Sequence, residues 1–376
     1  MVNVRYVGPA KDYSGYGEAV RHDIVALLTA GVNVTTKVPK YTPEIADFGR
    51  LAELIDPLYE RPIDYKVIIL HTTPNVYTRY MEEGKYHIGR VFWETDKLPE
   101  EFTRNIQLMD EIWTGSEFNK EALIKSGITK PIYIIPEAID TTLDVSTIQP
   151  YTVDQDLGYK FYSMFEWTDR KNPAALLEAY YLEFEHDKGV SLSIKTYLDN
   201  FSKEKRDEID QNIRKIKARL NLSNYAPVFL YRNLMDRAQI YRFHKTFDCF
   251  VSAHRGEGWG IPQMEAMLCG KPVISTDCGG IHEYIKGTAQ EPAALLPGYA
   301  MVPLAGNNRN QQWYTSDQKW AEVDINQLRQ CMRRAFEDQY GMKLMGKRAQ
   351  EIVKQRFSLD AVGSIMKSRL ETVGAL

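Results

Sequence analysis

The sequence predicts an α/β protein made of two Rossmann-like domains that face a cleft. A chain of 376 residues is longer than the ~100–200 residues of one ordinary domain. Short apolar segments alternate with helical patterns, which is typical of parallel sheets that helices cover on both faces. The alternation stops near residue 150 and then begins again. We therefore expect domains at residues 1–150 and 151–355, followed by a terminal helix within residues 356–376.

The first domain is predicted to open with a strand at residues 2–7 and a glycine-containing turn at residues 14–17. An amphipathic helix follows the turn and ends at Gly31. A strand, a glycine turn and a helix in this order open a Rossmann-like unit. The remaining strands are expected at residues 65–70, 88–93, 111–114 and 131–136, with helical patterns at 100–109 and 117–125.

The second domain repeats this alternation from residue 159 onward. Its strands are expected at residues 159–165, 191–197, 228–231, 249–252 and 272–275. Helices are predicted at residues 172–185 and 202–220, and the second of them is strongly charged. A last helix at residues 359–370 ends the pattern.

The charge of the chain argues against a protein that binds nucleic acid or a membrane surface. The net charge is −3, so no global attraction to phosphate groups is expected. The first 150 residues carry 16 basic and 22 acidic side chains, which makes this half acidic. We expect only weak binding to duplex DNA and to anionic lipid.

The cysteines and the hydrophobic pattern predict a cytoplasmic chain without a transmembrane segment. The sequence has four cysteines, Cys249, Cys269, Cys278 and Cys331, with no C-x-x-C spacing and no nearby histidine pair. This pattern argues against a zinc site and against a disulfide framework. The first residues lead directly into a strand without an apolar signal region. No run approaches the ~18 apolar residues that a membrane helix needs.

The most informative segment is residues 257–280, with the sequence EGWGIPQMEAMLCGKPVISTDCGG. Glycines surround its first carboxylate, Glu257, and glycine lets a backbone approach a ligand where a Cβ would clash. Pro262 is tolerated in the first turn of a helix, so N–H groups near residues 260–263 can bind an anion or hydroxyl groups. Glu265 then lies on the helix. The two carboxylates can face one ligand, a sugar at one end and a ribose at the other.

This segment resembles the signature of retaining family-4 glycosyltransferases of the GT-B fold. In that signature, two glutamates separated by seven residues precede Ala-Met, Gly-x-Pro-Val and a small-residue turn, here residues 266–267, 270–273 and 279–280. The resemblance covers nearly the whole chain and is looser before residue 89. It implies a GT-B fold whose C-terminal helix crosses back to the first domain. It also implies a nucleoside-diphosphate sugar as donor substrate, with no required cofactor.

The resemblance implies roles for the residues of this segment. Glu257 would contact hydroxyl groups of the donor sugar, and Glu265 would accept hydrogen bonds from the ribose. Main-chain groups of four residues would help to seat the donor: Gly258, Trp259, Gly260 and Ile261.

Arg170 and Lys171 are the predicted catalytic cations. A departing diphosphate needs its charge stabilised, and preorganised cations do this best in a partly dry site. The two residues match the Arg and Lys that follow the first strand of the second domain in the family. A solvated basic pair is the alternative, but basic residues at a helix N-terminus oppose the helix dipole.

Two short motifs give weaker signals. Gly15 and Gly17 lie where the family's first-domain glycine loop contacts the donor phosphates or the acceptor, and a plain tight turn is the alternative. The sequence Asp154-Gln155-Asp156 has the D-x-D form that other transferases use to hold a divalent metal ion. It lies in the expected linker with no strand before it, so we interpret it as a loop and expect no metal to be required.

Four further residues are candidates for the cleft. The family often places a histidine near the end of a first-domain strand, and this sequence has Glu94 and Thr95 at the matching position. His71 follows a predicted strand, although a histidine there is more often structural. His254 precedes the two-glutamate segment and is therefore close to the expected chemistry.

The expected activity is retaining, metal-independent transfer of a sugar to an acceptor hydroxyl, such as one on a glycan or glycoconjugate. One alternative is a glycosyltransferase that acts on modified nucleic acid, which the acidic first domain disfavours. The other is a non-catalytic protein that binds a sugar nucleotide or a glycan. The presence of Glu257, Glu265, Arg170 and Lys171 argues against that second alternative.

Overall fold

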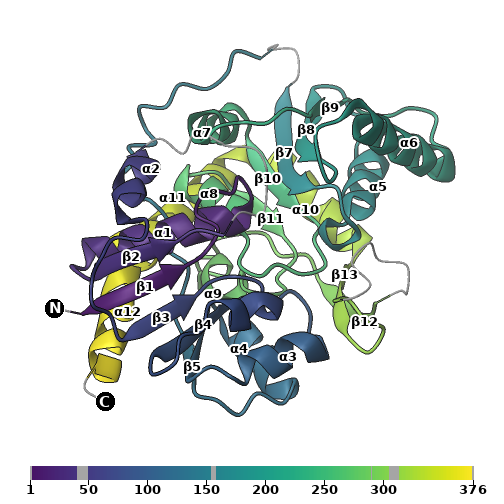
Figure 1. Cartoon of the computed structure of the whole chain (residues 1–376). Helices are drawn as coiled ribbons and strands as arrows, with labels where there is room; N and C mark the ends of the chain where they lie inside the picture. Colours follow the sequence, from purple (N-terminus) through teal and green to yellow (C-terminus); the bar gives the residue numbers. More distant parts are fainter. Residues whose placement is uncertain (1, 40–49, 154–157, 289, 305–312, 375–376) are drawn as a thin grey trace. The chain divides into compact units, whose positions relative to one another are not determined.

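The computed structural model describes residues 2–39, 50–153, 158–288, 290–304 and 313–374, and the chain forms two compact units (Figure 1). The first unit contains Met1–Leu143, Gln312–Gln318 and Val353–Leu376, and the second contains Asp144–Gln311 and Lys319–Ile352. The sequence predicts limits at residues 150 and 355, whereas the units change after Leu143 and after Ile352. No sequence pattern indicates that Gln312–Gln318 belongs to the first unit.

The first unit is built on a six-stranded parallel sheet with the order β2-β1-β3-β4-β5-β6. The strands are β1 (Asn3–Val7), β2 (Asn33–Lys37), β3 (Val67–Leu70), β4 (Tyr86–Val91), β5 (Glu111–Thr114) and β6 (Ile132–Ile134). Because β1 lies between β2 and β3, the chain extends the sheet first on one side and then on the other. The strand order 2-1-3-4-5 is one of the two common orders of doubly wound α/β sheets.

Helices cover both faces of this sheet because successive strand residues point to opposite sides. Val4 and Ile69 belong to a core shared with helices α1 (Gly15–Thr29) and α12 (Leu359–Gly374). Val7 and Ile68 belong to a second core with α3 (Glu100–Ile106) and α4 (Glu117–Lys125). The short helix α2 (Arg50–Ile55) packs beside α1.

The last helix, α12, packs against α1 within the first unit (Figure 1). A Cβ on Gly363 would lie 2.2 Å from the Ala26 carbonyl oxygen, so only glycine permits this close helix contact. Further along α12, the Arg369 guanidinium lies 2.5 Å from Glu111 Oε2 on β5 and 3.7 Å from the centre of the Tyr133 ring. The predicted return of the terminal helix to the first domain is therefore present.

The second unit contains a five-stranded parallel sheet with the order β11-β10-β7-β8-β9. The strands are β7 (Tyr159–Glu166), β8 (Val190–Tyr197), β9 (Val228–Tyr231), β10 (Cys249–Ser252) and β11 (Val273–Ser275). From β7 the chain moves outward through β8 and β9, and then crosses to the other side of β7 to form β10. The point between β7 and β10 is thus a topological switch point, where ligands of open α/β sheets usually bind.

The two faces of the second sheet have separate cores. On one face, Phe161 and Leu192 pack with α5 (Pro173–Glu183), α6 (Lys203–Leu220) and α10 (Ile325–Glu337). On the other face, Tyr162 packs on Phe243 of α7 (Arg237–Thr246) at a ring distance of 5.9 Å. Helix α8 (Ile261–Leu268) lies beside α7, β10 and β11, and the chain continues through α9 (His282–Ile285) and α11 (Gln339–Arg356).

An antiparallel hairpin of β12 (Tyr299–Pro303) and β13 (Lys319–Val323) interrupts this pattern. Its strands belong to the second unit, but residues 313–318 between them pack in the first unit. Tyr314 stacks on Trp93 at 5.4 Å, and Trp313 packs on Phe102 at the same ring distance. The sequence analysis did not predict this hairpin, nor β2, α7, α10 and α11.

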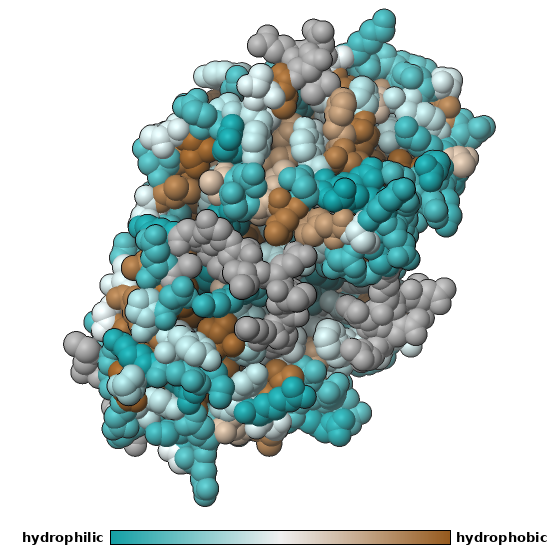
Figure 2. Space-filling view, turned by 45° about the horizontal axis from the view of Figure 1, so that its top comes forward, coloured by the Kyte–Doolittle hydropathy of each residue, from teal (hydrophilic) through white to brown (hydrophobic). Residues whose placement is uncertain are grey.

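The prediction of two parallel α/β domains is confirmed. The visible surface is mostly hydrophilic, with hydrophobic residues in groups between hydrophilic ones (Figure 2). Within the described part of the chain, no helix is long and apolar enough to cross a lipid bilayer.

Candidate functional site

Glu257 lies in the loop after β10, and a neighbouring glycine turn holds its backbone. The Gly280 N–H donates to the Glu257 carbonyl oxygen at 2.8 Å, and Glu257 forms an isolated β-bridge with Gly279. Gly279 has a φ of +102°, and a Cβ there would lie 2.1 Å from the Glu257 carbonyl oxygen. The glycine pair at the end of the two-glutamate segment therefore fixes the position of its first glutamate.

Gly260 forms the turn between Glu257 and helix α8. Its φ is +88°, and a Cβ there would lie 2.4 Å from the Ile281 side chain. The Tyr284 hydroxyl donates to the carbonyl oxygens of Trp259 and Gly260 at 3.0 and 2.7 Å. The Pro262-containing helix expected after this turn is present as α8.

The Glu257 carboxylate is buried against two cations. Lys171 Nζ lies 2.5 Å from Oε1 and 2.7 Å from Oε2, and Arg170 Nη1 lies 3.2 Å from Oε2. Burial alone would raise the pKa of the Glu257 carboxyl, but the charges of Lys171 and Arg170 lower this pKa to about 2. Glu257 is therefore ionised at neutral pH, and the three side chains together carry one excess positive charge.

The two cations lie on a short 3₁₀ turn, Asp169–Lys171, that follows β7. Asn172 ends this turn in the left-handed region with a φ of +53°, and its side chain caps α5 by accepting from the Ala175 N–H. The Arg255 N–H donates to the Arg170 carbonyl oxygen at 2.7 Å. The turn after β7 is thus tied to the loop after β10, at the switch point of the sheet.

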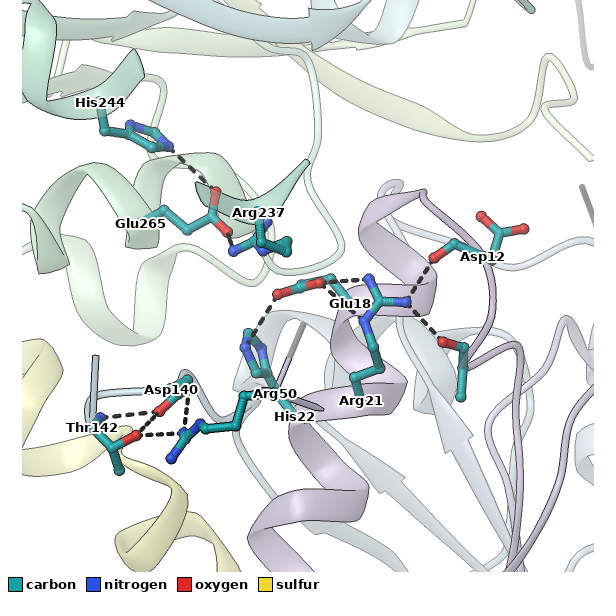
Figure 3. Close-up of polar contacts among 11 residues, drawn as sticks. Asp12, Glu18, Arg21, His22, Arg50, Asp140, Thr142, Arg237, His244 and Glu265 are labelled. Carbon is teal, nitrogen blue, oxygen red and sulfur yellow. Dashed lines mark hydrogen bonds and ion pairs between the residues drawn. The ribbon is translucent and has the colours of Figure 1, made fainter. Parts of the chain in front are cut away.

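Glu265 forms a second buried cluster on α8 (Figure 3). One of its carboxylate oxygens pairs with Arg237, and the other lies 3.3 Å from His244 Nε2. The other ring nitrogen of His244 lies 3.0 Å from the Tyr162 hydroxyl. Burial lowers the pKa of His244, an effect that Glu265 partly opposes. A carboxylate has about four acceptor sites, so Glu265 can still accept from a ligand.

The sequence analysis missed Arg237 and His244, the two partners of Glu265. Both lie on α7 seven residues apart, a spacing that places side chains on one face of a helix. This spacing was visible in the sequence. What the sequence could not show was that α7 would pack beside α8.

The residues between the two glutamates differ in exposure. The Trp259 side chain is 3 % exposed, its Nε1 lies 3.1 Å from Met264 Sδ, and its ring packs on Tyr284 at 5.3 Å. It is therefore part of the core, and only its main chain suits the role expected of it. Gly258 and Ile261 are half-buried.

His254 is fully buried beside the Glu257 cluster. Burial lowers its pKa to about 4, although the nearby Glu257 charge acts in the opposite direction. Among the described residues, no side chain hydrogen-bonds its ring nitrogens, and a hydrogen bond to the main chain of Thr276 also opposes the lowering of its pKa. His254 is thus a neutral imidazole within electrostatic range of Glu257.

The candidate glycines of the first unit lie at the start of α1. Gly15 is the first helical residue, and the Ser14 side chain caps the helix by accepting from the Gly17 N–H at 3.3 Å. A Cβ on Gly17 would lie 2.2 Å from the Asp12 carbonyl oxygen. Close backbone packing therefore already explains why Gly17 is a glycine.

The polar side chains that follow Gly17 on α1 form ion pairs with one another. Glu18 lies 2.5 Å from Arg21 and 3.3 Å from His22 (Figure 3). The Arg21 guanidinium also donates to the carbonyl oxygens of Ala10 and Asp12. This buried network fixes the turn that precedes the helix.

The other three candidates of the first unit, His71, Thr95 and Glu94, also make polar contacts to residues of the same unit. His71 is fully buried, with Nδ1 2.7 Å from the Tyr6 hydroxyl, and burial lowers its pKa. Thr95 is fully buried, and its hydroxyl lies 2.9 Å from Gln318 Oε1. Glu94 is half-buried and accepts from the Tyr314 hydroxyl at 3.2 Å. Of these three residues, Glu94 is the most exposed.

The structure places one group of predicted residues together: Glu257, Arg170, Lys171 and His254. Among the described residues, no three His, Cys, Asp or Glu side chains lie close enough to hold a metal ion. The D-x-D sequence Asp154-Gln155-Asp156 lies outside the described residues. The expectation that no metal is needed therefore stays a prediction.

Two parallel α/β units and a returning C-terminal helix are features of the GT-B fold. Residues 169–291 match the family model described as "Glycosyl transferases group 1", and this range holds both glutamates and both cations. This part of the chain is therefore similar to group 1 glycosyl transferases, in agreement with the resemblance seen in the sequence.

Individual relatives support the same fold. Sucrose-phosphate synthase from Thermosynechococcus elongatus is 15 % identical, with a TM-score of 0.71 and full coverage of both chains. Anabaena HepE, solved with UDP and glucose, is 16 % identical, with a TM-score of 0.63 and full coverage of both. Over 54 residues, the chain is 35 % identical to the lipopolysaccharide core biosynthesis mannosyltransferase LpsB of Rhizobium meliloti (strain 1021). That match spans 14 % of this chain and 15 % of the relative.

Proposed function

We propose that this protein is a retaining glycosyltransferase that moves a sugar from a nucleoside-diphosphate sugar to an acceptor hydroxyl. The observation that carries the proposal is the cluster of Glu257, Arg170 and Lys171 at the topological switch point of the second sheet. Such a point is the usual ligand site of an open α/β sheet. Its excess positive charge suits a diphosphate, and its carboxylate suits sugar hydroxyls.

Arg170 and Lys171 are proposed to bind the diphosphate. Negative charge grows on the leaving phosphate oxygen as the glycosidic bond breaks, and fixed cations in a half-buried site stabilise this charge. Glu257 would accept hydrogen bonds from the donor sugar, while main-chain groups of Gly258, Gly260 and Ile261 seat it. Glu265, held by Arg237 and His244, would accept from the ribose hydroxyls.

The proposal needs no covalent intermediate on the protein. The bond from the anomeric carbon to the phosphate oxygen breaks, and the acceptor oxygen forms its bond to the same face of that carbon. The acceptor proton passes to the departing phosphate oxygen. The chain's own residues bind the charged group, hold the sugar and limit access of water.

The acceptor is proposed to be a glycan or another neutral hydroxyl compound. The acidic composition of residues 1–150 disfavours a nucleic-acid acceptor because phosphate binding normally needs a basic surface. A cytoplasmic location is part of the proposal, since Cys249, Cys269, Cys278 and Cys331 are all free thiols.

A ligand screen tests this function. Thermal unfolding of the protein is followed with UDP, GDP, ADP and their sugar conjugates, because a ligand that binds only the folded state raises its apparent stability. We expect one nucleotide series to raise Tm, and its sugar conjugate to be converted to free nucleoside diphosphate. A rise in Tm without turnover would indicate a non-catalytic sugar-nucleotide binder. No rise with any nucleotide would contradict the proposal.

A further inference from the structure

The carboxylate of Glu265 ends a chain of buried hydrogen bonds that begins on β7. Glu265 is 2 % exposed and lies between Arg237 and His244 (Figure 3). Arg237 pairs with one carboxylate oxygen, and His244 Nε2 lies 3.3 Å from the other. On the far side of the imidazole ring, the Tyr162 hydroxyl of β7 lies 3.0 Å from Nδ1. Tyr162 and His244 are both fully buried, so the chain joins β7, α7 and α8.

The chemistry of the three groups fixes the direction of each hydrogen bond. A carboxylate only accepts hydrogen bonds, so His244 carries its proton on Nε2 and donates it to Glu265. Burial lowers the pKa of His244, which keeps the ring neutral at pH 7 and leaves Nδ1 as an acceptor. Burial also raises the pKa of Tyr162 well above its ordinary value, so its hydroxyl keeps a proton and donates it to Nδ1. Tyr162 thereby sets the tautomer of His244 that Glu265 needs.

Aromatic packing holds Tyr162 in place without the help of its hydroxyl. The ring lies 5.9 Å from Phe243, 5.5 Å from Phe247 and 5.1 Å from Phe250. A phenylalanine would keep these contacts, so the core needs the ring of Tyr162 but not its hydroxyl. Strand β7 also leads into the turn Asp169–Lys171. The strand that places the proposed diphosphate cations therefore also carries the side chain that acts on Glu265 through His244.

We infer that Tyr162 and His244 are positioning residues that give the donor site its preference for a ribose. With one donor on each oxygen, the Glu265 carboxylate cannot rotate without breaking a buried hydrogen bond, so the directions from which it accepts further hydrogen bonds are fixed. These directions suit the neighbouring 2′- and 3′-hydroxyls of a ribose, and neither positioning residue contacts the ligand. This inference rests on the proposed function, because it needs Glu265 to bind the ribose of a nucleoside diphosphate.

Discrimination between ribose and dideoxyribose tests the inference. The probes are whichever of UDP, GDP and ADP raises the Tm of the wild type most, and the 2′,3′-dideoxy analogue of that nucleotide. Calorimetry measures both affinities. We expect the wild type to bind the ribose form about tenfold or more tightly, the usual gain from hydrogen bonds to a charged group. Tyr162→Phe allows the His244 proton to move to Nδ1, and we expect the affinity ratio to fall at least about threefold, through weaker binding of the ribose form alone.

Tyr180→Phe is the matched control for Tyr162→Phe. Tyr180 is also fully buried, its ring packs on Phe184 at 5.5 Å, and its hydroxyl donates to the Pro227 carbonyl oxygen at 3.0 Å. Each variant loses one buried hydrogen bond of a tyrosine, so we expect similar decreases in Tm. The ratio of ribose to dideoxyribose affinity should fall only in Tyr162→Phe. An equal fall of the ratio in both variants would overturn the inference, because it would reflect a general weakening of the fold.

Two variants of His244 test the same point without a change to Tyr162. The side-chain amide of glutamine reaches about as far as Nε2 of histidine, whereas that of asparagine is shorter. His244→Asn is therefore expected to lower the affinity ratio, and His244→Gln to restore most of it. In the His244→Gln background, Tyr162→Phe should not change the ratio further, because an amide donates without a choice of tautomer. If Tyr162→Phe does not fold, the ratios of the two His244 variants decide the inference.

The outcomes separate this inference from the proposed function. A ribose preference that stays unchanged in Tyr162→Phe and His244→Asn would overturn the inference and leave the glycosyltransferase proposal intact. Equal affinity of the wild type for the ribose and dideoxyribose forms would overturn the inference together with the assignment of Glu265 to the ribose. Failure of the wild type to bind any of the three diphosphates would contradict both the inference and the proposed function.

Discussion

Lys171 Nζ contacts both carboxylate oxygens of Glu257, at 2.5 and 2.7 Å. The lysine follows β7 and the glutamate follows β10, so the contact joins the two strands that flank the topological switch point of the second sheet. A buried carboxylate in this place is held ionised by its cationic neighbours.

Acid is expected to destabilise the protein through Glu257. The pKa of its carboxyl is lowered from 4.5 to about 2 in the folded chain. The ion pair therefore adds stability above about pH 4.5, and this stability is lost as the pH falls from there to about 2. This pKa shift contributes of the order of 3 kcal/mol to the free energy of unfolding at neutral pH. Urea unfolding between pH 5 and pH 2.5 measures it, and Glu257→Gln should show a shallower decline; equal slopes for the two proteins would contradict this account.

Arg170→Ala and Lys171→Ala are expected to weaken nucleoside-diphosphate binding about tenfold or more, the loss of a charge-assisted hydrogen bond. Both variants should also slow transfer, because the cations contact the phosphates before and during the reaction. Calorimetry measures the affinity. The matched control is Arg333→Ala: Arg333 lies on α10, and its guanidinium pairs with Glu183 and Asp187. Equal affinity in all four proteins would mean that the basic pair serves only the fold.

Transfer activity is expected to persist in EDTA. The proposed mechanism assigns stabilisation of the leaving diphosphate to Arg170 and Lys171, and the D-x-D sequence lies in the predicted linker. The measurement compares initial rates with and without excess chelator. A loss of activity that Mg²⁺ or Mn²⁺ restores would show that a metal ion performs part of the work assigned to the two side chains.

Gly279→Ala is expected to reduce activity more than tenfold and to lower Tm. Its Cβ would lie 2.1 Å from the Glu257 carbonyl oxygen, so the loop that carries Glu257 must move. Gly270→Ala is the control, because Gly270 also has a positive φ, +71°, but its nearest contact would be at 3.8 Å. Both variants bear the backbone strain of a left-handed alanine, roughly 1–2 kcal/mol. Similar activity in the two would show that Gly279 does not position Glu257.

The sequence was sufficient to predict most of the elements and to single out Glu257, Arg170 and Lys171, which the structure brings together. Buried parallel strands are largely continuous apolar segments, so β3 (VIIL) and β10 (CFVS) were visible as such. The glycines around Glu257 and the basic pair before Pro173 lie in turns. The conformation of a turn depends on residues that are adjacent in the sequence, so these turns could be predicted. The structure brings these two local signals together because β7 and β10 are neighbours.

The remaining features depend on contacts between distant residues. Strand β2 has the polar sequence NVTTK, which lacks an apolar pattern, and α7 could be linked to Glu265 only through its packing beside α8. Thr95 was a candidate for the cleft, but Gln318, which is 223 residues away, covers its hydroxyl. The sequence assigned only a main-chain role to Trp259 and did not show that Tyr284 packs on its ring. No local pattern predicts such contacts.

The most direct test of the central claim is the turnover of Glu257→Gln at saturating donor, compared with the wild type. The donor is the sugar conjugate identified by the thermal screen, and the measured product is free nucleoside diphosphate. Because the amide keeps the size of the carboxylate but loses its charge, we expect turnover to fall at least about tenfold, equivalent to about 1.4 kcal/mol at the transition state. The circular dichroism of the folded protein should be unchanged. Unaltered turnover in a folded Glu257→Gln protein would contradict the assignment of the catalytic site to this carboxylate.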